Sequence, residues 1–199
     1  MINFLFAVVT AFLKCIFRIK INGADNIPAD GGCMICSNHI SNWDPVVLIC
    51  CLPRRVAFLC KEEVRAVPFV GWLLDKVGII FIKRGSGDIA AVRTCIKAID
   101  EGKAVGIFPT GTRERVCANA KPKSGATLIA AKSGTKVVPV GVQATYKLFS
   151  KITINIGEPI DFAEFKGTKL NQELLENKTN EIYDKIIKNR ACEIEKNVV

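Results

Sequence analysis

A chain of 199 residues has the length of one domain with a sizeable core. Apolar residues make up 49% of it, and its mean hydropathy of +0.25 indicates contact with lipid or with a partner. Its formal charge of +9 favours an anionic partner, either membrane lipid, nucleic acid or an acidic carrier protein. Because the basic residues are scattered rather than clustered with aromatic residues, the sequence argues against a nucleic-acid-binding face.

The N-terminal segment, residues 1–20, is an apolar run followed by Lys14, Arg18 and Lys20. The run is too short to span a bilayer, which needs about 20 apolar residues. It has neither a preceding basic region nor a following small-residue cleavage site, so a secretory signal peptide is not expected. Its pattern predicts a helix that lies in one leaflet of a membrane, with its cations among the headgroups. A core helix of the domain is the alternative, and the two overlap, because an interfacial helix can also pack on the domain.

The remaining residues, 21–199, are predicted to form one α/β domain, because predicted strands and helices alternate. We expect a largely parallel central sheet flanked by helices. Strands are predicted over residues 18–22, 33–37, 55–60, 78–82, 104–108, 137–142 and 151–156, and helices over 45–51, 68–76, 125–132 and 170–189, with a further helix from Ser86 or Asp88 to Gly102.

The nine cysteines are an odd number, and most lie in apolar stretches. Cys33 and Cys36 form a C-x-x-C pattern, but in a strand their side chains would point to opposite faces. With a single histidine and no second C-x-x-C pattern, no zinc or other metal site is expected. The cysteines are predicted to be reduced thiols that fill the core in a reducing compartment.

The single histidine, His39, follows a predicted buried strand, and Asp44 lies five positions later. We expect a turn between them, with Asp44 as N-cap and Pro45 as first residue of the next helix. On one helix they would be about 140° apart and could not meet. A turn lets the carboxylate bind one ring nitrogen and leaves the other free to take a proton, as in the base and orienting residue of a triad. A structural histidine beside a capping aspartate is the alternative.

A second motif, Phe81-Ile82-Lys83-Arg84-Gly85, places two cations on a turn after an apolar strand. Arg84 can hold a phosphate through two parallel hydrogen bonds, whereas a lysine cannot. A solvated basic turn is the alternative explanation.

A third motif begins at Phe108, after another buried strand. Gly111 permits close approach of the backbone to an anion, and Arg113 offers a guanidinium group. Thr110 and Thr112 add hydroxyl groups. Lys123 lies just before a predicted helix, whose N-terminal amides suit anions.

Together with the strand Val137–Val142, these motifs resemble the 1-acylglycerol-3-phosphate acyltransferase family of glycerolipid acyltransferases. Order and spacing both fit, over roughly residues 23–157. The matched positions are Asn38, His39 and Asp44 in N-H-x-x-x-x-D; Phe81, Ile82 and Arg84 in F-I-x-R; Phe108, Pro109, Gly111, Thr112 and Arg113 in F-P-E-G-T-R; and Val138, Pro139 and Val140 in V-P-V/I.

The resemblance implies transfer of a fatty acyl chain from acyl-CoA or acyl carrier protein to the sn-2 hydroxyl of lysophosphatidate, giving phosphatidate. His39 would be the general base and Asp44 its orienting partner, with no metal or bound cofactor. The enzyme would be peripheral or monotopic on the cytoplasmic face of an anionic membrane, such as a bacterial inner membrane. Residues expected to bind the acceptor are Arg84, Thr110, Gly111, Thr112, Arg113 and Lys123.

One position departs from the family, because Thr110 stands where the third motif has glutamate. In the family this glutamate is thought to help bind the acceptor. Thr110 keeps a hydrogen-bonding group but loses the charge and the reach of glutamate. Two alternatives therefore stay open: an acyltransferase with a different lysolipid acceptor, and a non-catalytic peripheral lipid-binding protein.

Overall fold

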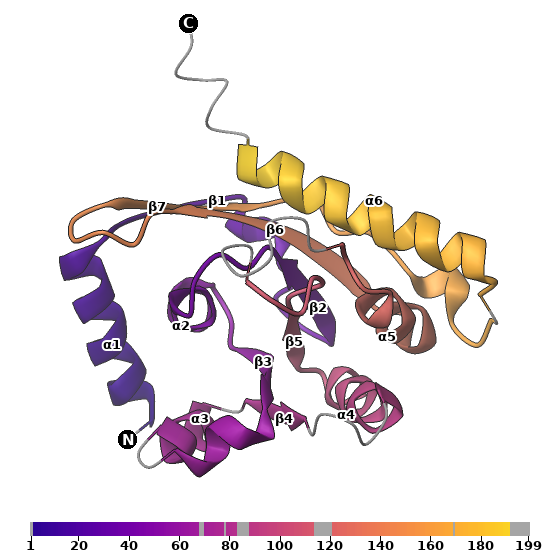
Figure 1. The fold of residues 1–199 in the computed structure, drawn as a ribbon, viewed down its shortest axis with the longest axis horizontal. Helices are drawn as coiled ribbons and strands as arrows, with labels where there is room; N and C mark the ends of the chain where they lie inside the picture. Colours follow the sequence, from indigo (N-terminus) through magenta and orange to yellow (C-terminus); the bar gives the residue numbers. More distant parts are fainter. Residues whose placement is uncertain are drawn as a thin grey trace, which may run out of the picture.

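The computed structural model describes residues 2–67, 70–77, 79–82, 88–113, 121–168 and 170–191. They form one α/β domain with a seven-stranded sheet and helices on both faces, which confirms the predicted fold class (Figure 1). The strands are β1 (Arg18–Asn22), β2 (Cys33–Ser37), β3 (Val56–Lys61), β4 (Ile80–Ile82), β5 (Ala104–Ile107), β6 (Lys136–Ala144) and β7 (Lys151–Ile156), and the α-helices are α1 (Ile2–Ile16), α2 (Trp43–Cys51), α3 (Val70–Val77), α4 (Asp88–Asp100), α5 (Gly125–Ser133) and α6 (Gln172–Ala191).

The strands follow the order β1-β7-β6-β2-β5-β3-β4 across the sheet. Neighbouring strands from β6 to β4 are parallel, so the carboxyl ends of these five strands lie at one edge. β7 is antiparallel to β6, and β1 is parallel to β7. The connection from β6 to β7 and the start of β1 therefore lie at that same edge. We call it the carboxyl edge.

The two faces of the sheet bury different sets of side chains because successive residues of a strand point to opposite sides. Cys33 and Ile35 of β2 pack with α1 and α2, whereas Met34 and Cys36 pack with α4, α5 and α6. The predicted separation of the two cysteines is thus confirmed. Burial raises the pKa of the Cys36 thiol to about 12, so it stays protonated and behaves as a small apolar side chain.

Helix α1 packs on the domain with one side and is open to solvent on another. Leu13 is completely buried, and the Thr10 hydroxyl donates a hydrogen bond to the Cys50 carbonyl of α2 at 3.1 Å. Phe4, Val8 and Phe12, spaced four apart, are exposed. Within the described ranges, no helix combines the length and the apolar character needed to cross a bilayer.

We predict that Leu13→Ala lowers the free energy of unfolding by about 2–5 kcal/mol, because it leaves a cavity between α1 and the sheet. Phe12→Ala, one position away on the open side, should change it by less than about 0.5 kcal/mol. Urea denaturation followed by circular dichroism measures both. Equally small effects would show that α1 is not held to the domain.

Candidate active site at the carboxyl edge

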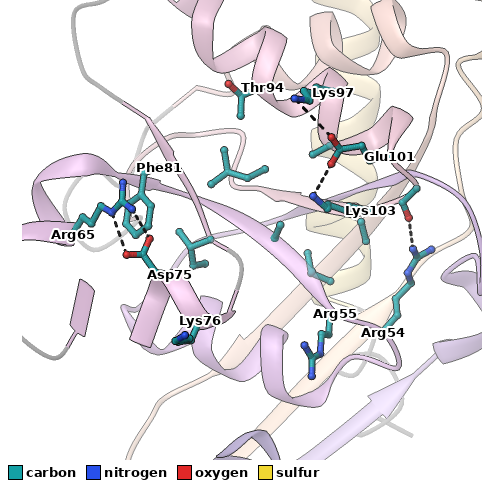
Figure 2. Close-up of a pocket in the computed structure, with 17 residues that line it drawn as sticks. Arg54, Arg55, Arg65, Asp75, Lys76, Phe81, Thr94, Lys97, Glu101 and Lys103 are labelled. Carbon is teal, nitrogen blue, oxygen red and sulfur yellow. Dashed lines mark hydrogen bonds and ion pairs between the residues drawn. The ribbon is translucent and has the colours of Figure 1, made fainter. Parts of the chain in front are cut away.

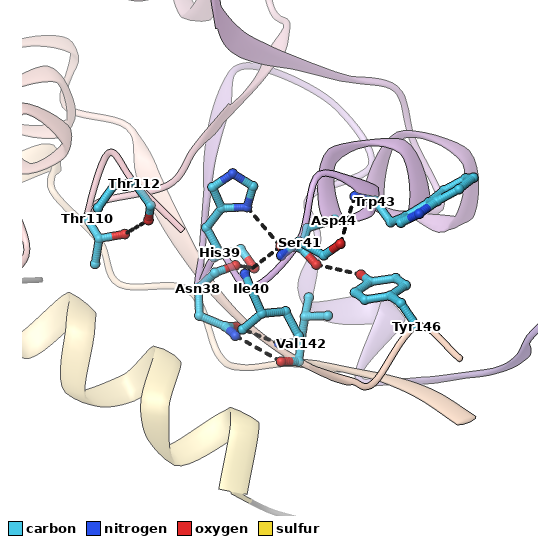
Figure 3. A network of polar contacts seen from close by, with 11 residues as sticks. Asn38, His39, Ile40, Ser41, Trp43, Asp44, Thr110, Thr112, Val142 and Tyr146 are labelled. Carbon is cyan, nitrogen blue, oxygen red and sulfur yellow. Dashed lines mark hydrogen bonds and ion pairs between the residues drawn. The ribbon is translucent and has the colours of Figure 1, made fainter. Parts of the chain in front are cut away.

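The connection from β2 to α2 brings His39 and Asp44 into contact, as the sequence predicted (Figure 3). His39 Nδ1 lies 2.8 Å from Asp44 Oδ2. The histidine side chain is 16% exposed and the aspartate is fully buried. Because a carboxylate only accepts hydrogen bonds, Nδ1 carries the proton and Nε2 is the basic nitrogen. Nε2 has no hydrogen-bond partner within the part of the chain that the structure describes.

Four donors surround the Asp44 carboxylate. Oδ2 also accepts the backbone N–H groups of Ile40 at 2.6 Å and Ser41 at 2.7 Å. Oδ1 accepts the hydroxyl of Tyr146 at 2.5 Å. These donors replace the water that the buried carboxylate has lost, and they fix its orientation toward His39.

The predicted capping role of Asp44 is wrong, because α2 begins two residues earlier than predicted, at Trp43, with Asn42 as N-cap. The Asp44 carboxylate accepts N–H groups of the turn that precedes the helix, so it does not cap the helix itself. Pro45 therefore lies third in the helix. Proline is tolerated there because the first N–H groups of a helix have no partner within it.

Tyr146 was not found from the sequence. It lies in the β6–β7 connection, 102 positions from Asp44, and no pattern around it predicts the contact. Burial, and secondarily the neighbouring Asp44 carboxylate, raises the pKa of the Tyr146 hydroxyl well above its usual value. The hydroxyl thus remains protonated and remains a donor to Asp44 throughout the physiological pH range.

Asn38 ties the histidine turn to β6. Its side-chain amide donates to the Val142 carbonyl at 2.9 Å and accepts from the Val142 N–H at 2.7 Å. The β2–β6 backbone pairing ends at Ser37, so this buried amide continues the pairing in place of a peptide group. The first and fourth motifs are joined in this way, since Val142 lies just beyond Val140.

Phe108 joins the first motif to the third. Its ring stacks on the His39 ring with centroids 4.2 Å apart and planes at 15°. The Phe108 ring also stacks on the ring of Phe58 in β3, with centroids 5.1 Å apart. Gly106 leaves room for this arrangement, because a Cβ atom there would lie 2.6 Å from the Phe58 ring. The stack gives the imidazole a fixed apolar support.

The third motif forms a tight turn after β5. Thr110 is 4% exposed, and its hydroxyl donates to the Thr112 carbonyl at 2.9 Å. Gly111 has a φ of 65°, which suits glycine, and its N–H donates to the Phe108 carbonyl. Lys123 lies beside this turn: its N–H donates to the Pro109 carbonyl at 2.9 Å. A Cβ on residue 111 would lie 3.7 Å from Lys123 Nζ.

The structure gives less detail about Arg113 and Arg84, two residues that were predicted to bind phosphate. Arg113 is half-buried and follows the turn directly. Arg84 lies outside the described residues, between β4 and α4. β4 is parallel to β3, so the chain leaves the sheet toward the carboxyl edge just before Arg84. Within the described residues, no group of three His, Cys, Asp or Glu side chains could hold a metal ion.

A cavity of about 890 Å³ lies elsewhere, at the amino ends of β3 and β5 (Figure 2). None of the predicted site residues lines it. Three of its cations have partners: Arg65 pairs with Asp75 at 3.1 Å, Lys103 pairs with Glu101 at 2.6 Å, and Arg54 donates to two carbonyl oxygens. Six cations and only two carboxylates line the cavity, so its lining keeps an excess of positive charge.

Comparison with known proteins identifies relatives of this chain. The family model described as Acyltransferase matches residues 18–143. A 1-acyl-sn-glycerol-3-phosphate acyltransferase of Borreliella burgdorferi is 33% identical over 182 residues, which cover 86% of this chain and 71% of that protein. A lyso-ornithine lipid O-acyltransferase of Pseudomonas aeruginosa is 42% identical over 77 residues, or 38% of this chain and 29% of that protein.

Among solved structures, the 1-acyl-sn-glycerophosphate (LPA) acyltransferase PlsC of Thermotoga maritima superposes with a TM-score of 0.70 at 26% identity. The match covers 96% of this chain and 81% of that chain. The protein is thus an α/β acyltransferase. It belongs to the 1-acylglycerol-3-phosphate acyltransferase family of glycerolipid acyltransferases, as the four motifs indicated.

We predict that Asn38→Ala lowers the free energy of unfolding by roughly 2–4 kcal/mol, because the N–H and carbonyl of Val142 both lose their buried partner. Asn180→Ala, on the exposed side of α6, is the matched control and should change it by less than about 0.5 kcal/mol. Chemical denaturation provides the measurement. If Asn38→Ala lowers the free energy of unfolding no more than the control does, the role given to this amide is wrong.

Proposed function

We propose that the protein transfers a fatty acyl chain from an acyl thioester to the sn-2 hydroxyl of 1-acylglycerol-3-phosphate, giving phosphatidate. The observation that carries this proposal is the hydrogen-bonded pair of His39 and Asp44, in which the second ring nitrogen has no partner among the described residues. The relative from Borreliella burgdorferi and the structure from Thermotoga maritima, both named for this reaction's acceptor, support it.

In the proposed reaction, His39 Nε2 takes the proton of the acceptor hydroxyl as the oxygen attacks the thioester carbonyl. A carbon–oxygen bond forms, and a tetrahedral intermediate follows. The carbon–sulfur bond then breaks, and the thiolate leaves with the proton from His39. Asp44 stabilises the imidazolium between the two steps, and Tyr146 positions Asp44. No metal or bound cofactor takes part, and the acyl donor, acyl-CoA or acyl carrier protein, is a substrate.

The acceptor phosphate would lie beside the turn of the third motif. Lys123 and Gly111 are adjacent there, and Arg113 follows the turn, so two cations and an accessible backbone meet at one place. The family resemblance adds Arg84 of the second motif as a further cation for this phosphate. Thr112 would shape the pocket wall, since its carbonyl already accepts the Thr110 hydroxyl.

The proposal includes peripheral association with the cytoplasmic face of an anionic membrane, such as a bacterial inner membrane. It is supported by the exposed row Phe4, Val8 and Phe12 on α1 and by the basic Lys14 near the end of that helix. One side of α1 packs on the domain and the other side is apolar and exposed. This arrangement suits contact with a single leaflet of the membrane. The lysolipid acceptor would then reach His39 from the lipid surface.

A different lysolipid acceptor is the second candidate, and Thr110 is the observation that favours it. The buried hydroxyl is engaged with its own turn and brings no charge to the acceptor. The similar lyso-ornithine lipid O-acyltransferase shows that an aminolipid acceptor occurs among such proteins. The third candidate, a non-catalytic lipid-binding protein, predicts no thioester turnover with any acceptor.

We predict that His39→Ala lowers acceptor-dependent thiol release from a long-chain acyl-CoA by about 10²–10⁴-fold, the usual contribution of a general base. Lys136→Ala, at the opposite edge of the sheet, should leave the rate within about twofold of wild type, as surface changes away from a site usually do. Thermal melting verifies that both variants are folded. Undiminished turnover in His39→Ala would refute the assignment of the base.

We predict that Thr110→Ser, which keeps the hydrogen bond to the Thr112 carbonyl, retains kcat/KM for the acceptor within about threefold. Thr110→Val has the same shape but loses the bond, so it should lower that kcat/KM by about tenfold, the worth of one such bond, with KM for acyl-CoA unchanged. Lysophosphatidate and lyso-ornithine lipid are assayed side by side. A clear preference for lyso-ornithine lipid would favour the second candidate acceptor over lysophosphatidate. A further variant, Thr110→Glu, restores the family residue. Activity in that variant alone would mean that Thr110 disables the site.

A further inference from the structure

Exposed apolar side chains lie on three elements that meet at the carboxyl edge. In the described part of the chain, nine large apolar side chains are exposed. Three of them are on separate segments: Val67 between β3 and α3, Ile89 on α4 and Ile187 on α6. The other six are Phe4, Val8 and Phe12 of α1, Trp43 at the start of α2, and Leu148 and Phe149 in the β6–β7 connection.

These three elements contact one another directly. The N–H of Phe149 donates to the carbonyl of Ile16 at the end of α1, at 2.8 Å. The ring of Phe17 meets the rings of Trp43 and Tyr146 edge-on, at centroid distances of 6.2 and 5.8 Å. Figure 1 shows the β6–β7 connection beside the end of α1. The six exposed residues thus lie on adjoining elements.

The backbone of the β6–β7 connection is held in an unusual conformation. Tyr146 and Phe149 have φ values of 54° and 60°, and they are the only non-glycine residues in the described ranges with positive φ. Such a conformation costs free energy for a residue with a side chain and persists only where its surroundings impose it. Here it turns Tyr146 inward to Asp44 while Phe149 stays in solvent.

The charge around this surface has one sign. Residues 1–24 and 115–157 contain no aspartate or glutamate. Lys14, Arg18 and Lys147 are exposed there. Apolar side chains bordered by cations suit the boundary between the headgroups and acyl chains of an anionic bilayer, where the cations stay at headgroup level.

We propose that Leu148 and Phe149 enter an anionic lipid bilayer, so that the β6–β7 connection is a second membrane contact beside α1. The same connection carries Tyr146, which donates to Asp44, so the contact sets the proposed catalytic pair directly at the lipid surface. This inference deepens the proposed function, because it rests on peripheral membrane association and adds the element that orients the site.

The test is flotation of the full chain with vesicles of phosphatidylglycerol and phosphatidylcholine in equal parts. The variant Leu148→Ser with Phe149→Asn removes the apolar tip, and asparagine tolerates the positive φ. Leu148→Ser alone is the second variant in case the first does not fold. Ile89→Ser on α4 is the matched control, because Ile89 is 66% exposed and Leu148 is 68% exposed. Phe12→Ser reports on α1.

We expect vesicle affinity to fall by roughly tenfold or more in the double variant and about threefold in Leu148→Ser, following the loss of buried apolar area. Ile89→Ser should bind like wild type. Binding by the double variant equal to wild type, with a loss in Phe12→Ser, would overturn the inference and leave membrane association through α1 standing. The readout is binding, so absence of acyl transfer would not affect it.

Two further outcomes also contradict the inference. If wild type fails to bind vesicles, both the membrane association in the proposed function and the second contact are wrong. If wild type forms dimers that the double variant breaks, and neither binds vesicles, the exposed tip is a contact between copies of the chain. Analytical ultracentrifugation of wild type and the double variant separates this outcome from lipid binding.

Discussion

The burial of the Asp44 carboxylate is the constraint on which the site depends. A carboxylate removed from water must be satisfied by donors, and here they come from three places: His39, the turn that follows it, and Tyr146. Each donor is thereby fixed in position relative to the others. The imidazole has one orientation and one tautomer because its partner has no freedom, and the ring of Phe108 supports it from one side.

The topology of the sheet explains why these donors meet. β2, β5 and β6 are parallel, so the histidine turn, the third motif and the end of β6 emerge at one edge. β7 returns antiparallel to β6, which places the β6–β7 connection and Tyr146 at that edge as well. β1 is parallel to β7, so α1 also ends there. One reversal of strand direction therefore brings the exposed apolar side chains of the β6–β7 connection to the same edge of the sheet as the proposed catalytic pair.

Several features were predictable from local sequence. The strand Cys33–Ser37 follows from its apolar run, and the contact between His39 and Asp44 follows from their spacing across a turn. The start of α2 was predicted wrongly, because Asp44 has the residue type of a cap but its carboxylate accepts N–H groups of the preceding turn. Residue type alone does not say which N–H groups a carboxylate meets.

The sequence by itself determined the family, the α/β class, the histidine–aspartate contact and the apolar character of the N-terminal helix, since these depend on periodicity and on short motifs. Only the tertiary structure decided that Tyr146 binds Asp44, that Asn38 continues the β2–β6 pairing, and that Leu148 and Phe149 lie beside α1. The physical reason is distance along the chain. These contacts join residues more than 100 positions apart, and strand order and direction, which no local pattern records, bring them together.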